Sequence, residues 1–323
     1  MNKMLLSLTV IAIIALFLGC AQSPNSQPIK KATQQREIAA NPIAYCSKDG
    51  GSTWLPFSEG LPENETIHGF AFAGDTAWAA TNSHGVFIKI GNGVWAQHGV
   101  LPDGVKVSAI INTGGGLVIG TFSHGIRRME NGKGTWQSAQ TDFAKTPVRG
   151  LMAHGDKIFA ATNAGVFSSS DGGQNWAHAF GDFQCNGFAA EGNKVYLAAM
   201  NGAYLSEDGG VAWRKIYAPK TLHDIAVDGQ RVFAMTLGEE LLSSDDDGKN
   251  WSNANTGLEL GRYTFEVKKM GISLFLGHWT GIFKSENSGQ NWLPVGGGLP
   301  ADTAFPVIET NGTFIVAAIG LRG

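Results

Sequence analysis

Seven tryptophans recur along this chain at almost constant spacing, with steps of 41, 41, 40, 37, 38 and 41 residues. A period of about 40 residues with strand-like content is the sequence signature of a radial β-repeat. Because repeat folds grow by adding units, a chain of 323 residues needs no single large core. The period predicts seven β-units, one for each of Trp54, Trp95, Trp136, Trp176, Trp213, Trp251 and Trp292.

The composition agrees with short strands joined by tight turns. Charged residues make up only 16% of the chain, and 44 residues are glycine. The net charge of −3 provides no basic surface of the kind that nucleic acid requires. We therefore expect an all-β protein with no nucleic-acid partner.

Most of the tryptophans close a short turn motif, S-x-D-x-G-x-x-W in its fullest form. Five copies are well formed, at 47–54, 169–176, 206–213, 244–251 and 285–292. The copies at 88–95 and 129–136 are eroded. The motif resembles the Asp-box, or bacterial-neuraminidase repeat.

In each full copy, an aspartate or asparagine can accept hydrogen bonds from nearby backbone N–H groups. The glycine two positions later suits a positive φ, and the tryptophan packs over the hairpin. The alternative is that the carboxylates bind calcium or catalyse a reaction. A motif repeated in nearly every unit favours a structural role, so we predict a structural set of Asp49, Trp54, Asp171, Trp176, Asp208, Trp213, Asp246, Trp251, Asn287 and Trp292.

Each unit contains four strand-like segments, which we name A to D from the axis outward, with the box between C and D. The A segments are 67–72, 107–112, 148–153, 185–190, 222–227, 263–268 and 305–310. The chain begins with a C segment at 43–46 and ends with an A and a B segment. These half-units complete one blade if the ring closes, whereas an open array would leave exposed strand edges. We predict a seven-bladed β-propeller with four-stranded blades, closed by N- and C-terminal strands that share one blade.

The N-terminus predicts export. Residues 5–19 form an apolar run of 15 residues, too short to span a bilayer and typical of a signal peptide. The run ends in Leu-Phe-Leu-Gly-Cys (16–20), which resembles a bacterial lipobox. The resemblance implies cleavage before Cys20 and lipidation of its thiol; the alternative is an ordinary signal peptide with a chance cysteine.

We therefore expect a lipoprotein signal peptide at 1–19, a lipidated flexible tether at 20–42 and a propeller at 43–323. The expected location is the cell envelope, at the outer membrane or cell surface, because Ala21 is not the aspartate that retains lipoproteins at the inner membrane. The membrane would be contacted through the N-terminal lipid, and the propeller is expected to be monomeric. Cys46 and Cys185 lie about three units apart and are expected to be free and packed.

Alternating strands place the boxes on one face of a propeller and the B–C and D–A connections on the other. By resemblance to propeller families, the second face is the expected ligand site. The candidates there stand near the start of the A strands or in the B–C turns. They are His68, Arg149, Asn186, His223, Asp224, Arg262, His84, His124, Glu239, His278 and Trp279, with Ser108, Thr264 and Pro306 at equivalent A positions.

These side chains could bind an anionic, sugar-like or peptide ligand, or could simply cap backbone groups. No spaced ligand motif predicts a metal, and no cofactor is expected. The Asp-box also resembles that of sialidases, which use three arginines, a Tyr–Glu pair and an aspartate. The chain lacks their Arg-Ile-Pro motif, and seven units do not match their six blades.

Single seven-bladed Asp-box propellers include the photosystem II stability and assembly factor family, which this chain resembles in fold and boxes. We therefore expect a non-catalytic, membrane-tethered binding or scaffold propeller that recognises a protein or glycan. The alternatives are an exo-acting glycoside hydrolase of the sialidase type and a purely structural surface component.

Overall fold

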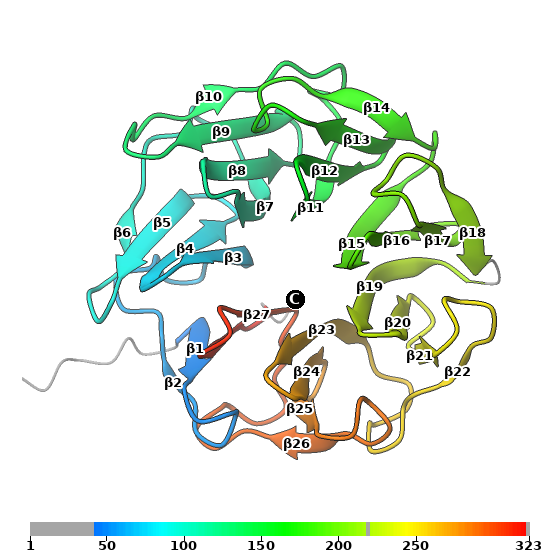
Figure 1. Cartoon of the computed structure of the whole chain (residues 1–323). Helices are drawn as coiled ribbons and strands as arrows, with labels where there is room; N and C mark the ends of the chain where they lie inside the picture. Colours follow the sequence, from blue (N-terminus) through cyan, green and yellow to red (C-terminus); the bar gives the residue numbers. More distant parts are fainter. Residues whose placement is uncertain (1–41, 218–219, 321–323) are drawn as a thin grey trace, which may run out of the picture. The chain divides into compact units, whose positions relative to one another are not determined.

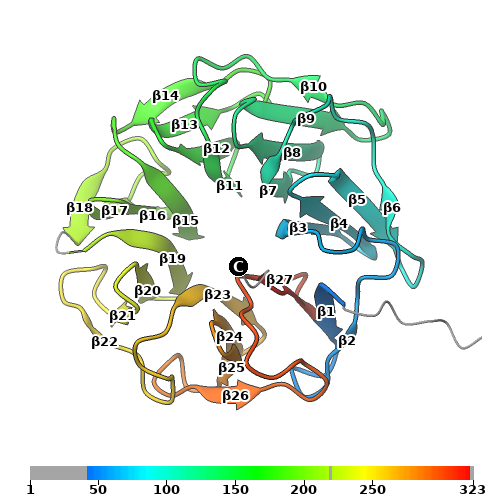
Figure 2. The ribbon, with the colours of Figure 1, turned by 180° about the vertical axis from the view of Figure 1, so that it is seen from behind.

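Residues 42–217 and 220–320, which this computed structural model describes, form seven four-stranded antiparallel sheets around a central axis (Figure 1). Viewed from behind, the same ring of sheets surrounds the axis (Figure 2). Each sheet holds one tryptophan of the periodic series, so the predicted seven-bladed propeller is confirmed. Within the described residues, no helix is long and apolar enough to cross a bilayer. The predicted signal peptide, Cys20 and the tether lie outside these residues, except for Pro42.

The A strands lie nearest the axis and define blades 1 to 7. They are β3 (Ile67–Ala73), β7 (Val107–Asn112), β11 (Val148–His154), β15 (Cys185–Glu191), β19 (Leu222–Asp228), β23 (Thr264–Met270) and β27 (Val307–Thr310). The B strands are β4 (Thr76–Thr81), β8 (Gly116–Thr121), β12 (Lys157–Thr162), β16 (Lys194–Ala199), β20 (Arg231–Thr236), β24 (Ser273–His278) and β28 (Ile315–Ala318).

The C strands are β5 (Gly85–Ile90), β9 (Ile126–Glu130), β13 (Gly165–Ser169), β17 (Gly202–Ser206), β21 (Leu241–Ser244), β25 (Gly281–Ser285) and β1 (Ala44–Ser47). The outer D strands are short: β6 (Ala96–Gln97), β10 (Gln137–Ser138), β14 (Ala177–Phe180), β18 (Arg214–Tyr217), β22 (Ser252–Asn253), β26 (Leu293–Val295) and β2 (Leu55–Pro56).

The ring closes through the seventh blade. Its strand order is β2-β1-β28-β27, so the first two strands of the described chain pair with the last two. Ala44 faces Ala318 and Ser47 faces Ile315 in the antiparallel register between β1 and β28. The inner strand β27 also contacts β3 of the first blade. Closure by a shared blade is therefore confirmed, and it leaves neither half-blade with an open inner edge.

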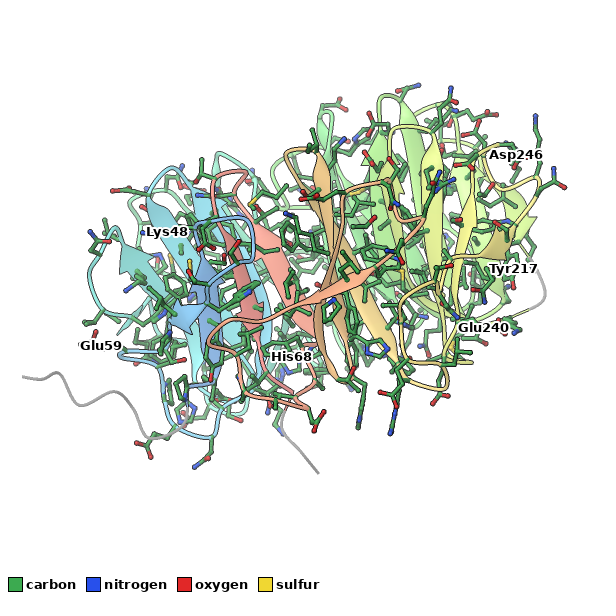
Figure 3. All side chains as sticks on the ribbon, turned by 90° about the horizontal axis from the view of Figure 1, so that it is seen from below. Lys48, Glu59, His68, Tyr217, Glu240 and Asp246 are labelled. Atoms are coloured by element: carbon green, nitrogen blue, oxygen red, sulfur yellow. The ribbon has the colours of Figure 1, made fainter. Side chains whose placement is uncertain are left out.

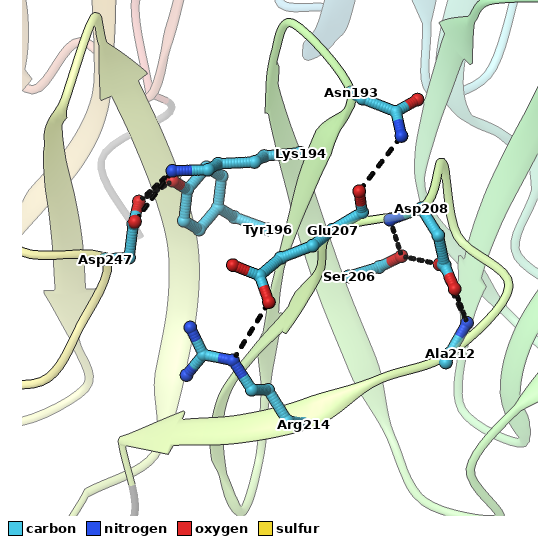
Figure 4. Close-up of polar contacts among 9 residues, drawn as sticks. All are labelled: Asn193, Lys194, Tyr196, Ser206, Glu207, Asp208, Ala212, Arg214 and Asp247. Carbon is cyan, nitrogen blue, oxygen red and sulfur yellow. Dashed lines mark hydrogen bonds and ion pairs between the residues drawn. The ribbon is translucent and has the colours of Figure 1, made fainter.

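The Asp-box hydrogen bonds are present as the residue types predict. In the box of blade 4, Asp208 Oδ1 accepts from the N–H of Ala212 at 2.9 Å and from the Ser206 hydroxyl at 2.7 Å (Figure 4). Ser206 Oγ in turn accepts from the N–H of Gly210 at 2.7 Å. The φ of Gly210 is 84°, and a Cβ there would lie 2.5 Å from a ring carbon of Phe159. Glycine is thus required both by the turn and by the neighbouring blade.

Equivalent hydrogen bonds lower the pKa of three other box aspartates to about 2. For Asp49 the main cause is the hydroxyl of Thr53, and for Asp171 and Asp246 it is the backbone N–H four residues later. The box is therefore a turn that favours the ionised carboxylate.

The box tryptophans also join neighbouring blades. The backbone N–H of Trp95 donates to the carbonyl of Glu59 at 2.9 Å. Glu59 lies in the linker that follows the D strand of the preceding blade. Gly60, in a Gly-Leu-Pro segment of that linker, has a φ of 97°, and a Cβ there would lie 2.2 Å from the Trp95 carbonyl oxygen. Gly298 makes the same close approach to Trp54. The Gly-Leu-Pro segments therefore mark where one blade meets the box of the next.

In the eroded boxes the indole also bonds to the preceding blade, whereas the indoles of Trp54 and Trp176 donate to a glycine of their own box. The indole Nε1 of Trp95 donates to the carbonyl of Phe57 at 2.5 Å, and that of Trp136 donates to the carbonyl of His98 at 3.1 Å. Both acceptors belong to the preceding blade, so the indole joins two blades where the box aspartate is lost. Cys46 and Cys185 are buried and free, as predicted, and burial raises the pKa of each thiol.

Candidate functional site

The two faces of the propeller carry different parts of the repeat. Viewed edge-on, His68 and Glu240 lie toward one face, whereas Asp246 of an Asp-box lies toward the other (Figure 3). His68 stands near the start of an A strand, and Glu240 lies in a B–C turn. The predicted site residues therefore belong to the face opposite the boxes, around the end of the axial channel that we call the B–C mouth.

A one-residue β-bulge recurs in six of the seven A strands. In blade 3, for example, the register between β11 and β12 shifts between Val148 and Gly150, which leaves Arg149 without a partner on β12. A bulge bends the strand and redirects the side chain of the extra residue. The six bulged residues form an inner ring at the mouth: His68, Ser108, Arg149, Asn186, His223 and Phe265.

One member of this ring differs from the sequence prediction. The sequence predicts Thr264 at the equivalent position of blade 6, but Thr264 pairs with His278 and is buried, and Phe265 is the bulged residue. The reason is that β23 begins one residue later than the predicted segment. In blade 7, Pro306 directly precedes β27 and lines the channel. Aligning the buried first residue of each strand would have identified Phe265.

A second ring of residues, which we call the outer ring, lies just after the ends of the B strands. The first residue after each B strand donates its N–H to the carbonyl of the residue just before the A strand, as in Asn82 to Thr66 at 2.9 Å and Trp279 to Tyr263 at 2.9 Å. The same hydrogen bond therefore fixes this position in blades 1 to 6. Its occupants are Asn82, Phe122, Asn163, Met200, Leu237 and Trp279. Four of these six are large apolar residues that stay exposed: Phe122, Met200, Leu237 and Trp279.

The two rings contact each other within a blade. Arg149 Nε donates to Asn163 Oδ1 at 2.6 Å, and His68 Nε2 lies 3.4 Å from Asn82 Oδ1. Phe265 stacks on Trp279 with ring centroids 6.3 Å apart. In these blades, the inner-ring side chain and the outer-ring side chain therefore orient each other at the rim of the mouth.

Aromatic rings continue from the rim toward the channel in blades 5 and 6. Tyr263 packs against Phe265 with centroids 5.3 Å apart, and His223 stacks on Tyr263 at 4.6 Å. Burial lowers the pKa of His223 to about 4, which keeps the imidazole neutral at pH 7. Its Nε2 atom is buried without a hydrogen-bond partner.

A cavity of about 440 Å³ opens along the channel at this side. Four predicted residues line it: Arg149, Asn186, His223 and Asp224. Asn186 also joins two blades, because its Nδ2 donates to the carbonyl of Leu222 at 2.6 Å. The structure therefore brings part of the predicted set together around one cavity.

Charged side chains that the sequence analysis did not single out share this cavity. Glu266 accepts from the N–H of Ile308 at 3.0 Å, and Lys268 lies 2.9 Å from a carboxylate oxygen of Glu309. Burial, aided by the charge of Glu266, raises the pKa of Asp224 to about 8, against the opposing effect of Lys268. Burial also raises the pKa of Glu266. The signal available in the sequence was the pair of charges in an otherwise apolar A segment, Thr-Phe-Glu-Val-Lys.

Other predicted residues lie apart from this cavity. His278 is fully buried, with Nδ1 2.9 Å from the Thr280 hydroxyl, and burial lowers its pKa to about 4. His84 Nδ1 lies 2.5 Å from a carboxylate oxygen of buried Glu65. His124 is exposed beside Ser123. These three histidines therefore occupy unlike environments despite their similar places in the repeat.

Two charged candidates lie on the rim of blades 5 and 6. Arg262 Nε is 3.2 Å from a carboxylate oxygen of Glu259. Glu239 is exposed, with a φ of 63°, and its carboxylate lies beside Gly261 in the linker to blade 6. Across 42–217 and 220–320, no three His, Cys, Asp or Glu side chains are arranged to hold a metal ion.

A wider cavity of about 800 Å³ lies at the opposite end of the channel, on the side of the Asp-boxes. Its lining includes the apolar side chains of Phe70, Ile110 and Met152, together with Glu309. Leu151 lines both cavities. Polar side chains, among them Asn112 and Asn311, complete the lining of the wider cavity, so polar groups line the channel at both ends.

No protein-family model and no curated protein matches the chain. Solved structures match its fold. YCF48 bound to a D1 peptide aligns with a TM-score of 0.63 at 15% identity, over 88% of this chain and 97% of that one.

Two other similar structures are parts of longer chains. The extracellular domain of a putative one-component system from B. thetaiotaomicron has a TM-score of 0.67 at 15% identity, over 81% of this chain and 38% of that one. An ancestral GH74 enzyme has a TM-score of 0.57 at 19% identity, over 79% of this chain and 40% of that one. This chain thus spans less than half of those two chains, and at such identities the similarity shows the fold alone.

Proposed function

We propose that the protein is a non-catalytic binding or assembly module that holds a protein or glycan ligand at the B–C mouth. The observation that carries this proposal is the pair of rings. Their positions are equivalent from blade to blade, yet they hold unlike residues, and four of the outer six are large, apolar and exposed. Exposed apolar side chains that gather on one surface are typical of an interaction site. The fold it shares with a peptide-bound propeller is consistent with this role.

The test is ligand screening with variants of the mouth. We expect a ligand from a glycan array or a peptide library to bind without turnover and to lose at least tenfold in affinity in Arg149→Ala and Trp279→Ala. Val211→Ser, at an exposed position in the Asp-box of blade 4, is the matched control and should bind normally. Ligands that tolerate both mouth variants but not changes on the box face would contradict the proposal.

One observation favours a second candidate, an exo-acting glycoside hydrolase. Asp224 and Glu266 interact within a cavity, and a pKa of about 8 suits a general acid near neutral pH. Against it, only Arg149 and Arg262 of the described arginines stand at the mouth, whereas a sialidase needs three. Turnover of a fluorogenic sialoside that is abolished by both Asp224→Asn and Arg149→Ala would establish the enzyme.

The proposal includes export and tethering through lipid on Cys20, in the cell envelope. It is supported by the apolar run and the lipobox-like segment. Fractionation of cells that express the full chain should place it with membranes, and Cys20→Ser should release it. Equal membrane association of the two proteins would contradict the tether.

A further inference from the structure

The part of the mouth over blades 4 to 6 differs from the rest. Three large apolar residues of the outer ring lie there, and Leu260 of the linker to blade 6 adds a fourth. Their exposed fractions are 40% for Met200, 46% for Leu237, 51% for Trp279 and 73% for Leu260. We call these four residues the apolar sector. Exposed apolar groups that gather in one place mark interaction sites.

Backbone contacts connect the members of this sector. The Thr221 hydroxyl donates to the Met200 carbonyl at 2.7 Å, and the Thr221 carbonyl accepts from the N–H of Leu237 at 3.1 Å. Tyr263 connects blades 5 and 6 through its side chain: its carbonyl accepts from the N–H of Trp279 within blade 6, and its ring stacks on His223 of blade 5. Met200, Leu237 and Trp279 therefore stand on turns of neighbouring blades, and Leu260 lies in the linker between the last two of these blades.

The same sector is rich in carboxylates. At the rim, Glu240 pairs with Lys220 and Glu259 pairs with Arg262. Glu239 at the rim forms no ion pair with any described residue. In the cavity, burial raises the pKa of Asp224 and of Glu266, which favours the protonated form of both carboxyl groups. Three cations line the same cavity, Arg149, Lys268 and Lys269; Lys268 pairs with Glu309, and Lys269 pairs with Asp228. At its rim, the sector thus combines exposed apolar side chains with one carboxylate, Glu239, that has no ion-pair partner among the described residues.

We propose that this sector binds a polypeptide segment in which a lysine or arginine is flanked by large apolar side chains. Pyranose rings stack on flat aromatic faces and gain little from thioether or aliphatic side chains, whereas three of the four sector residues are methionine or leucine. Methionine adapts its shape to varied apolar partners. The cation complements Glu239 at the rim. This inference rests on the proposed function, because it names the ligand class of the same mouth.

The experiment is selection of a random dodecapeptide library on the immobilised full chain. Selected peptides should be enriched in Lys or Arg next to Leu, Ile, Phe or Met. In fluorescence anisotropy, a selected peptide should bind at least tenfold more weakly to Leu237→Ser and to Trp279→Ala. Glu239→Gln should weaken binding about threefold and reduce its dependence on salt. Ile272→Ser is the matched control, because Ile272 is 86% exposed in the turn between β23 and β24 on the other face.

The other outcomes of this experiment separate failure of the inference from failure of the proposed function. Selected peptides without basic residues, or peptides that bind Leu237→Ser and Trp279→Ala normally, would overturn the inference. A glycan whose binding is lost in Trp279→Ala would overturn the polypeptide partner but leave the mouth as the binding site. Self-association of the full chain that Leu237→Ser abolishes would assign the sector to a second copy and overturn the inference. Binding that no mouth variant affects would remove the proposed function as well.

Discussion

The Nζ atom of Lys268 lies 2.9 Å from Oε2 of Glu309, so an ion pair joins the inner strands of blades 6 and 7. Lys268 lines the cavity at the B–C mouth, and Glu309 lines the cavity on the box side. The positive charge thus stands among Asp224, Glu266 and Glu309, which raise the pKa of Lys268 despite the opposing effect of its burial. The pair thus stands where carboxyl groups from three blades act on one cation.

We expect Lys268→Met to destabilise the protein, because it leaves carboxylates facing one another without a cation. Removal of one partner of a buried pair costs more than the pair contributes. Each side chain is 31% exposed, so solvent screening limits the loss to about 1–2 kcal/mol. Urea denaturation measures this loss of unfolding free energy. The double variant with Glu309→Gln should recover part of the loss, and additive losses would refute the coupling.

Stability should fall as pH rises from about 6.5 to 8. The folded state keeps the Asp224 carboxyl protonated up to a pKa of about 8, while the unfolded state releases that proton near its ordinary value of 3.8. The folded state therefore binds more protons in this interval, and rising pH favours unfolding by at most about 1.4 kcal/mol per pH unit.

Two histidines set the lower limit of the pH range in which this effect of Asp224 can be measured. The pKa values of His223 and His278 are lowered to about 4, so these groups make stability rise with pH between about 4 and 6.5. Above about pH 6.5, these histidines no longer change the free energy of unfolding as pH rises. Asp224→Asn should flatten the decline in unfolding free energy between pH 6.5 and 8. An unchanged slope in this variant would show that Asp224 is already ionised in the folded state.

Gly60→Ala should destabilise the contact between blades 7 and 1. The substitution combines a φ of 97° with a Cβ only 2.2 Å from the Trp95 carbonyl oxygen, so backbone must move. We expect a loss of about 3 kcal/mol in urea denaturation. Gly74→Ala is the control, because Gly74 has a φ of 57° and nothing within 4 Å of its added Cβ. Equal losses would mean that only the backbone conformation matters.

Ser206→Ala should weaken the Asp-box of blade 4. Ser206 is fully buried, and its Oγ accepts from Gly210 and donates to Asp208. The loss of these hydrogen bonds leaves the Gly210 N–H unsatisfied, at a cost of about 1–2 kcal/mol. Hydrogen exchange should be faster at the Gly210 amide. Protection equal to that of the unmodified protein would show that the turn does not depend on the hydroxyl.

Much of the fold could be read from local residue chemistry. The tryptophans, the box glycines and the apolar segments each repeat about every 40 residues, because each blade must bury the same face against its neighbour. The order of strands around the first and last boxes predicted the shared blade. Even the place of the mouth followed from strand alternation, and Arg149, Asn186, His223 and Asp224 do line one cavity.

The finer arrangement of the site depended on long-range contacts. His278 and Trp279 are adjacent in the chain, yet the first is fully buried and the second is half-exposed. No local pattern separates them, because the difference arises where β24 stops pairing with β23. The bulge that brings Phe265 to the mouth likewise reflects the register between two strands.

The sequence by itself therefore determined the number of blades, their turns and the way the ring closes, because those features depend on a repeated local pattern. The tertiary structure decided which side chains share the channel. Asp224, Glu266, Lys268 and Glu309 come from three separate blades, and only packing of the inner strands around one axis brings their charges together.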